Sequence, residues 1–267
     1  MKMLTQSERL DYLVEEFKAD SETYKNMETP RDNETKRTIL RSLMNIRMPK
    51  MMAEDVLKVQ DDYLKARSEE KGIVTLEEIP IIKDCISIWQ GDITRLKVDA
   101  IVNAANSQML GCFVPMHTCI DNCIHTFAGV QLRNECSEKM NQMRKKYGND
   151  YEWPTAVPML TGAYNLPSRN VIHVVGPIVQ YKLTAKLEKE LASCYQNTLD
   201  LCMENNLRSV AFCCISTGVF HFPNRRAAEI AVETVTTWLK KHPGKLDRVV
   251  FNVFKDEDKR YYEELLY

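Results

Sequence analysis

Short apolar runs alternate with longer amphipathic stretches from about residue 80 onward, and this alternation limits the folds that the chain can adopt. The runs read "CISIW", "DAIVNA", "VIHVV", "SVAFCCI" and "RVVFNVF". Between them, segments 184–205 and 224–241 repeat apolar residues at helical spacing. Nearly continuous apolar strands that alternate with helices indicate a mostly parallel sheet covered on both faces. The sequence therefore predicts a three-layer α/β/α domain with a mostly parallel mixed sheet over residues 76–267.

The first part of the chain, residues 1–75, has the pattern of helices. "TQSE" at 5–8 fits a capping box and leads into apolar residues at helical spacing. A second helix is expected to begin at residues 29–30 and to end before Pro49, and a third to end near Gly72. No catalytic pattern occurs here. We expect a helical extension packed on the main domain; a partner-docking surface is the alternative.

Composition narrows the class of protein further. Among 267 residues the formal net charge is -1, which gives no electrostatic reason to expect nucleic acid or a membrane surface as a partner. No apolar stretch is long enough for a transmembrane helix, and the start "MKMLTQSERLDYLVEEF" lacks a signal-peptide core. We therefore expect a cytoplasmic protein. Its nine cysteines are then expected to be mostly reduced.

The segments that follow the predicted strands are rich in Gly, Ser, Thr and Asn. "DAIV" is followed by "NAANSQMLG", "VIHVV" by "GP", and "SVAFCCI" by "STGVFHFPN". Ligands of open α/β sheets bind beyond the carboxyl ends of the strands. These loops are therefore expected to converge on a binding site at one edge of the sheet.

The loop "STGVFHFPN" is suited to an anion. Gly218 would let the backbone turn and approach a ligand closely, while Ser216 and Thr217 add hydroxyl groups. The next helix offers its N-terminus, with Asn224 as a candidate cap. Neither a Walker lysine motif nor G-x-G-x-x-G is present, which argues against ordinary P-loop and Rossmann sites. An ordinary strand-to-helix turn remains the alternative.

Three polar residues near the first strands are further candidates. Asp92 in "QGDIT" could accept hydrogen bonds from an amino group such as that of adenine, or could cap a turn. Asn103 and Asn106 in "NAAN" could bridge hydroxyl groups or tie a loop to its neighbour. We favour the structural role for Asn103.

The stretch "GCFVPMHTCIDNCIH" at 111–125 concentrates cysteine and histidine. Cys112, His117 and Cys119 form C-x4-H-x-C, and two thiolates with an imidazole fit a Zn²⁺ site whose fourth position is open. Iron or cobalt could bind the same ligands. Reducing conditions argue against a disulfide. Cys123 could complete a four-ligand site, but we expect it and His125 to face the core.

In order along the chain, these motifs resemble a macrodomain, the ADP-ribose-binding α/β module. The matching segments are "QGDIT", "VDAIVNAANS", "IDNCIH", "GAYNLPSRNVIHVVGP" and "AFCCISTGVFHFP", and they span roughly residues 80–267. The family's usual glycine-rich loop is replaced by "CFVPMHTC", and "WPTAVPML" also departs from the usual pattern. Together with the helical extension, this looks like the zinc-dependent, sirtuin-linked microbial subgroup, whose members remove ADP-ribose from protein.

The resemblance assigns roles to individual residues. Asp92 and Ile93 match the adenine contacts, Asn106 matches the residue near the distal ribose, and Phe220 matches the aromatic residue that flanks it. The implied ligand-binding residues are Asp92, Ile93, Asn106, Ile120, Asp121, Asn122, Ser216, Thr217, Gly218, Val219 and Phe220. The implied ligands of a single Zn²⁺ are Cys112, His117 and Cys119.

The resemblance also implies an activity, the zinc-dependent hydrolysis of the bond between mono-ADP-ribose and a modified protein side chain. Asp121 would act as a base or hold the ribose, and Asn106 would orient the ribose. The implied partners are ADP-ribose and a mono-ADP-ribosylated protein, with a lipoylated carrier protein as one candidate. A reader that binds ADP-ribose without cleavage, its zinc being structural, is the main alternative. An enzyme acting on small ADP-ribose derivatives is a third.

Overall fold

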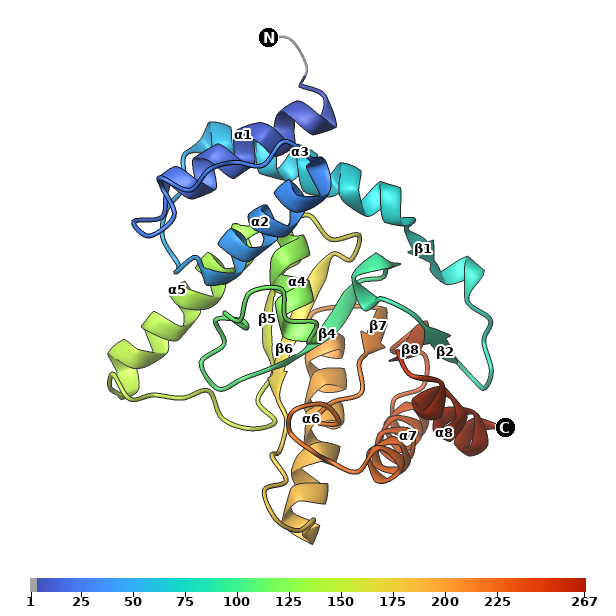
Figure 1. Cartoon of the computed structure of the whole chain (residues 1–267). Helices are drawn as coiled ribbons and strands as arrows, with labels where there is room; N and C mark the ends of the chain where they lie inside the picture. The colour runs from blue at the N-terminus through green and yellow to red at the C-terminus, as the bar shows by residue number, and fades with distance from the viewer. Residues whose placement is uncertain (1–3) are drawn as a thin grey trace.

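The centre of the molecule is a six-stranded sheet (Figure 1). The computed structural model describes residues 4–267, so the first three residues of the predicted extension lie outside it. The strands, in spatial order, are β2 (Ile86–Gln90), β8 (Arg248–Val253), β7 (Ser209–Phe212), β4 (Ala100–Ala105), β6 (Asn170–Val175) and β5 (Met159–Gly162). All neighbours are parallel except β5, which runs antiparallel to β6. The predicted mixed, mostly parallel sheet is confirmed.

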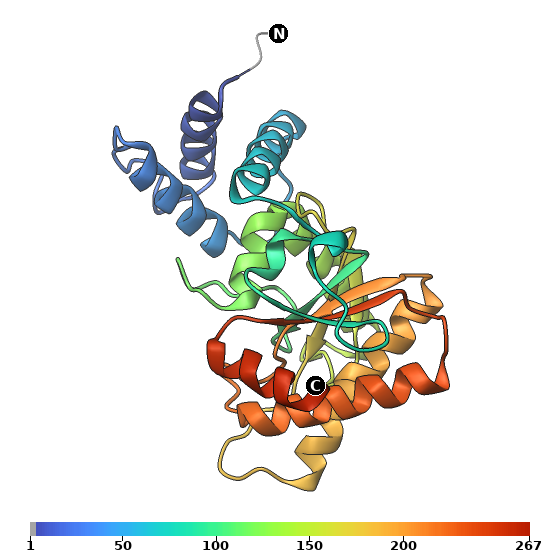
Figure 2. The same ribbon diagram turned by 90° about the vertical axis from the view of Figure 1, so that its right-hand side faces the viewer.

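Helices cover both faces of this sheet, as Figure 2 shows. One face carries α4 (Ile120–Ala128) and α5 (Val130–Tyr147), and the other carries α6 (Ala185–Glu204), α7 (Asn224–Lys241) and α8 (Asp256–Leu266). The two amphipathic segments expected at 184–205 and 224–241 are therefore helices α6 and α7. Short elements complete the domain: β1 (Val74–Thr75), η1 (Leu76–Glu78), η2 (Ile93–Arg95) and β3 (Leu96–Lys97).

Three helices form the N-terminal extension, namely α1 (Gln6–Ala19), α2 (Asn33–Ile46) and α3 (Glu54–Lys71). The predicted capping box of α1 is present. The predicted start of the second helix at residues 29–30 is wrong, because Asp32 caps α2 by accepting the N–H of Thr35. The third helix ends as predicted before Gly72, whose φ of 82° lies in the left-handed region that favours glycine.

The apolar side chains form two clusters. The larger one surrounds the sheet, and the smaller one joins α1, α2 and α3, with Leu13 and Val14 fully buried. Val130 at the start of α5 belongs to this smaller cluster, so the extension packs on the domain through α5. None of the described helices is long and apolar enough to cross a membrane.

Candidate functional site

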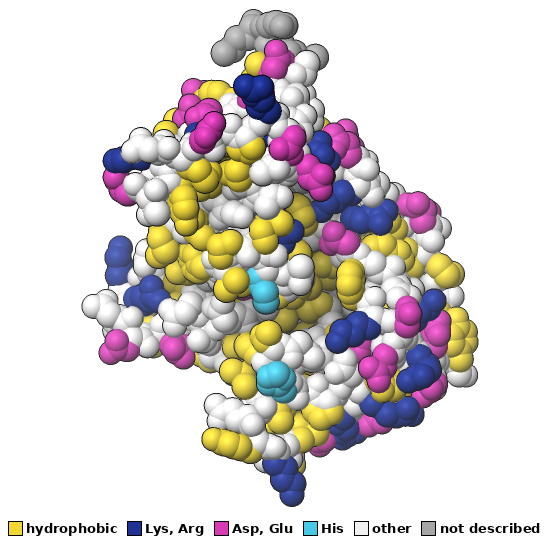
Figure 3. Space-filling view, in the orientation of Figure 1, with side chains coloured by type: hydrophobic (Ala, Val, Ile, Leu, Met, Phe, Trp, Pro, Cys, Tyr) yellow, Lys and Arg dark blue, Asp and Glu magenta, His cyan; other side chains and the backbone are white. Residues whose placement is uncertain are grey.

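A cavity of about 1110 Å³ opens at the carboxyl edge of the parallel strands. Its walls come from the segments that follow β2, β7 and β8, from the start of α4 and, unexpectedly, from α2 and α3. Figure 3 shows this face hollowed between the N-terminal helices and the α/β domain, with hydrophobic side chains gathered on its walls. The predicted convergence of the loops is thus present, and the extension adds a further wall.

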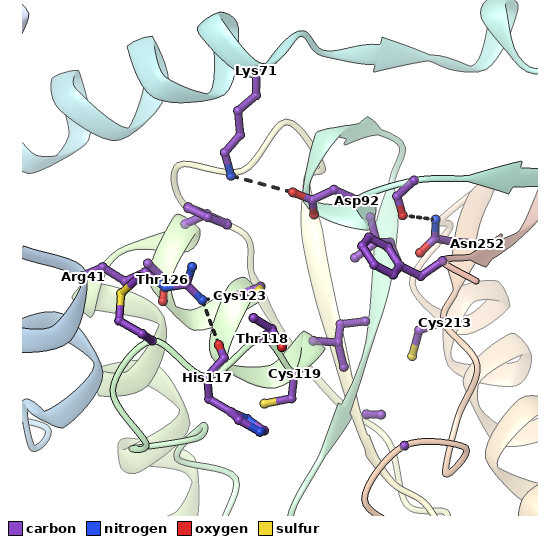
Figure 4. Close-up of a pocket in the computed structure, with 18 of the residues that line it drawn as sticks. Arg41, Lys71, Asp92, His117, Thr118, Cys119, Cys123, Thr126, Cys213 and Asn252 are labelled. Atoms are coloured by element: carbon purple, nitrogen blue, oxygen red, sulfur yellow. Dashed lines mark hydrogen bonds and ion pairs between the residues drawn. The ribbon is translucent and has the colours of Figure 1, made fainter. Parts of the chain in front are cut away.

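Cys112, His117 and Cys119 lie together at the rim of this cavity. Their ligand atoms lie within 4.8 Å of one another, and Cys112 Sγ is 3.6 Å from His117 Nδ1. Zinc bonds of about 2.0–2.3 Å can span such a separation in tetrahedral geometry. In Figure 4 the Cys119 sulfur and the His117 ring lie side by side below α4. The three half-buried side chains therefore fit a zinc ion.

The electrostatics of this cluster also suit a cation. Burial, with a smaller contribution from the nearby Cys112, raises the pKa of the Cys119 thiol to about 12. A metal ion bound beside this thiol would favour its thiolate form. Cys119 is also the N-cap of α4, where its Sγ accepts the N–H of Asn122 at 3.4 Å.

Asp92 lies at another part of the cavity wall. Its Oδ1 accepts hydrogen bonds from the Thr94 N–H (3.0 Å) and hydroxyl (2.6 Å), so the turn-capping role left open by the sequence is present. Its Oδ2 lies 3.7 Å from the Lys71 ammonium (Figure 4). That ammonium lies 3.0 Å from the centre of the Phe127 ring. Burial lowers the pKa of Lys71, and Asp92 opposes that shift. Ile93 also lines the cavity.

The loop after β7 contributes five consecutive lining residues, Ser216, Thr217, Gly218, Val219 and Phe220. The left-handed backbone needed for the turn occurs at Ser216 (φ 66°) and not at Gly218, which corrects the role expected of that glycine. A Cβ at Gly218 would meet nothing within 4 Å, so the glycine leaves room beside it. The buried Ser216 hydroxyl has no hydrogen-bond partner within residues 4–267.

The predicted cap at Asn224 is also wrong. Pro223 occupies the N-cap position of α7, and no side chain caps the helix there. The Asn224 amide instead donates to Asp258 Oδ1 at 2.6 Å, joining α7 to α8.

Asp121, two residues after Cys119, begins a buried polar network. Its Oδ1 accepts a hydrogen bond from Asn103 Nδ2 at 2.7 Å and lies 3.6 Å from His125 Nε2. Asn103 Nδ2 also lies 3.0 Å from His173 Nδ1, so Asn103 has the structural role that we favoured. Burial raises the pKa of Asp121 to about 6. The side chain is 7% exposed and is absent from the described cavity lining.

The buried histidine of this network should make the fold sensitive to acid. Burial lowers the pKa of His173 to about 3, whereas the unfolded chain titrates near about 6.5. As the pH falls below about 6.5, His173 gains a proton in the unfolded chain but stays neutral in the folded protein. We therefore expect the free energy of unfolding to fall by about 2 kcal/mol between pH 7 and pH 5 from this group. Urea unfolding at both pH values should show a smaller fall in the free energy of unfolding for His173→Gln than for wild type. An equal fall in the two proteins would contradict the assignment of this acid sensitivity to His173.

Asn106 and Asn122 lie outside the described cavity lining and bond to the segment before Cys119. Asn106 Oδ1 accepts the N–H of Gln108 at 3.0 Å, and its Nδ2 donates to Gly111 O at 3.4 Å. The fully buried Asn122 donates to the carbonyl oxygens of Cys112 (3.3 Å) and Val114 (2.9 Å). Both side chains therefore hold residues 111–119, the loop that carries the Cys/His cluster. Their ligand contacts stay predictions.

The expectation that Cys123 faces the core is wrong. It lines the cavity, and its Sγ lies 3.7 Å from Arg41 Nη2, because α2 lies beside this face of α4. His125 is buried as expected, but neither ring nitrogen has a hydrogen-bond partner within residues 4–267. Gly111 packs on this ring, where an added Cβ would lie 2.7 Å from it.

Sequence reasoning missed the residues that the extension supplies. Arg41 and Lys71 both line the cavity, and Asn45 accepts a hydrogen bond from Met116 in the loop between Cys112 and Cys119. Their spacing carries no catalytic or metal-binding pattern, because each acts through a partner that is distant in the chain. Only the three-dimensional packing of α2 and α3 against α4 reveals them.

Fold and site together define an α/β module that binds its ligand at the carboxyl edge of the sheet, with a Cys/His cluster at the rim. The family model "Macro domain" matches residues 102–231. Relatives that match nearly the whole chain support the same conclusion, so the chain belongs to the macro domain family.

Two curated relatives and one solved structure illustrate the similarity. Proteins named protein-ADP-ribose hydrolase from Treponema medium and from Staphylococcus aureus (strain MRSA252) are 44% and 42% identical to the chain. The match with the first relative covers 98% of this chain and 100% of that relative. The match with the second covers 96% of this chain and 94% of that relative. A Trypanosoma brucei macrodomain in complex with ADP-ribose superposes with a TM-score of 0.65 at 26% identity, covering 90% of this chain and 97% of that one.

Proposed function

We propose that this protein is a zinc-dependent protein-ADP-ribose hydrolase, which removes mono-ADP-ribose from a modified protein side chain and releases ADP-ribose. Its relatives over nearly the whole chain are named for this activity. The observation that carries the zinc dependence is the Cys112, His117 and Cys119 cluster, because two of its members line the cavity. The same cluster and the helical extension support membership in the sirtuin-linked microbial subgroup.

The cavity accommodates the parts of ADP-ribose as follows. Asp92 accepts a hydrogen bond from the adenine amine, and Ile93 packs beside the base. The backbone and hydroxyl groups of Ser216 to Phe220 surround the diphosphate, with the unpartnered Ser216 hydroxyl as one donor. Ile120, at the start of α4, borders the same space. The distal ribose then lies toward Cys119 and His117.

Hydrolysis replaces the bond between the anomeric carbon and the protein side chain with a bond to a water oxygen. When bound by Cys112, His117 and Cys119, zinc would supply Lewis acidity toward a ribose hydroxyl or water through its open position. Asp121 acts as the base or holds the ribose, with Asn103 orienting its carboxylate at 2.7 Å. Asn106 would help to orient the ribose, and its bonds to Gln108 and Gly111 hold the neighbouring loop in place. Adenine and diphosphate contacts hold the reacting centre in position.

The substrate in this proposal is a mono-ADP-ribosylated cytoplasmic protein, with a lipoylated carrier protein as the candidate from the family resemblance. The 1110 Å³ cavity is larger than the range of about 300–1000 Å³ typical of small-molecule pockets, which leaves space for the modified side chain. Nucleic acid and membranes are not partners in this proposal.

Metal removal tests the proposed function directly. Freshly purified protein should contain about one zinc per chain by elemental analysis. With a mono-ADP-ribosylated protein as substrate, it should release free ADP-ribose, and a chelator should lower the rate at least about 100-fold until zinc is restored. Binding of the substrate without release, unaffected by chelator, would identify a reader instead. Turnover confined to small ADP-ribose derivatives would identify the third alternative.

A further inference from the structure

The metal-cluster loop, residues 111–119, is held by helix α2 of the N-terminal extension. Arg41 Nη2 donates to the backbone carbonyl of His117 at 2.8 Å and to Asn122 Oδ1 at 3.0 Å. Figure 4 shows Arg41 extending from α2 toward α4, with a dashed line from its guanidinium to this carbonyl. A guanidinium that binds the backbone of a metal ligand fixes the position of that residue without touching the ion.

Asn45, one helical turn after Arg41, holds the residue before His117. Its Oδ1 accepts the N–H of Met116 at 3.0 Å, and its Nδ2 donates to Thr126 Oγ1 on α4 at 2.8 Å. Asn45 is 1% exposed, so neither hydrogen bond competes with bulk water. One buried amide therefore connects α2, the loop and α4.

Met116 shows why the loop needs this support. Its φ of 58° is left-handed, a conformation that costs a residue with a Cβ about 1–2 kcal/mol. Such strain persists only where the surrounding structure holds it. Met116 is 38% exposed, and the bond from its N–H to Asn45 restrains the backbone directly at this residue.

Arg133 of α5 joins the end of α2 to the start of the loop. Its Nη1 donates to the carbonyl oxygens of Met44, Asn45 and Arg47 at 2.6–3.0 Å, and its Nε donates to Leu110 O at 2.8 Å. The guanidinium also lies over the Phe113 ring, 4.3 Å from its centre. The C-terminal end of α2 is therefore fixed relative to the start of the loop.

We infer that helix α2 positions the metal ligands, with Arg41 and Asn45 as positioning residues that act through the backbone of Met116 and His117. The helical extension then belongs to the metal site, because its helix α2 supplies these two positioning residues. The inference rests on the proposed metal cluster. Loss of groups that orient metal ligands typically lowers metal affinity 10- to 100-fold.

The test measures metal binding alone, without substrate. Arg41→Met keeps the aliphatic stem but removes the donor, and Arg37→Met on the same helix, one turn earlier, is the matched control. Titration of the full-length proteins with Zn²⁺ against a chromophoric chelator should show affinity lowered about 10- to 100-fold for Arg41→Met and unchanged for Arg37→Met. Arg41→Lys, which can still donate to the His117 carbonyl, should restore part of the loss.

Cobalt spectra separate positioning from general destabilisation. Co²⁺ bound to two thiolates and one imidazole in wild-type protein should give tetrahedral absorption bands, and Arg41→Met should alter their intensity or position. Asn45→Asp keeps the acceptor for Met116 and should bind zinc more tightly than Asn45→Leu; this pair gives a second test if Arg41→Met does not fold. Wild-type affinity and spectra in Arg41→Met, or equal affinity of the Asn45 pair, would overturn the inference. Absence of metal binding in wild-type protein would overturn the proposed function itself.

Discussion

We expect Cys119→Ser to lose its metal and to release ADP-ribose at least about 1000-fold more slowly than wild type. Metal polarisation of oxygen contributes several kcal/mol to catalysis, and about 4 kcal/mol corresponds to this factor. Serine is chosen because Cys119 is the N-cap of α4, and a serine hydroxyl accepts the Asn122 N–H that the thiol now accepts. The measurements are zinc content, single-turnover release from a mono-ADP-ribosylated protein, and thermal unfolding.

Two further variants, Cys123→Ser and Asp92→Ala, serve as comparisons that should keep the metal. Cys123→Ser changes a cysteine that lines the same cavity but lies outside the described cluster, so it should keep both metal and turnover. Asp92→Ala should keep the metal and weaken ADP-ribose binding about 10- to 100-fold, because it removes a charged hydrogen-bond acceptor. Wild-type turnover in metal-free Cys119→Ser would eliminate zinc from the mechanism, and metal loss in Cys123→Ser would indicate a four-ligand structural site.

Much of the fold could be predicted from local sequence pattern. Five apolar runs and the helices between them correspond to β2, β4, β6, β7 and β8 and to their crossover helices, since burial on both faces gives parallel strands a readable pattern. The sequence pattern does not reveal strand β5, because "MLTG" is a short edge strand with alternating burial. The start of α2 was misplaced because Pro30 is a helix-start signal, yet the Asp32 side chain caps the helix two residues later.

The site was predictable where neighbouring residues carry its chemistry. Cys112, His117 and Cys119 are close in sequence and close in space, and Asp92 and the loop from Ser216 line one cavity as expected. Contacts between segments that are distant in the sequence cannot be predicted from local spacing. The bonds of Arg41 to His117 and of Asn103 to Asp121 depend on how α2 and β4 pack against α4, which no local pattern records.

Asp121→Asn tests the residue whose role the sequence left open. The substitution keeps an oxygen that can accept the Asn103 amide but removes the carboxylate charge. If Asp121 is the base, the rate constant for release should fall about 100- to 10,000-fold, while the dissociation constant for ADP-ribose changes less than about tenfold. Single-turnover kinetics and calorimetry at one pH measure the two quantities separately.

The matched control is Asp258→Asn, which changes a buried carboxylate of the cavity wall whose partner is Asn224. Its rate constant should stay within about threefold of wild type, because its carboxylate belongs to α8, whose contacts are with α7 and the β2–β8 edge of the sheet. The opposite split in Asp121→Asn, with binding weakened more than about 100-fold and the rate constant preserved, would assign the carboxylate to holding the ribose. Since Asp121 lies outside the described cavity lining and only two residues after Cys119, we expect the substitution to spare ADP-ribose binding and the loss to appear in the rate constant.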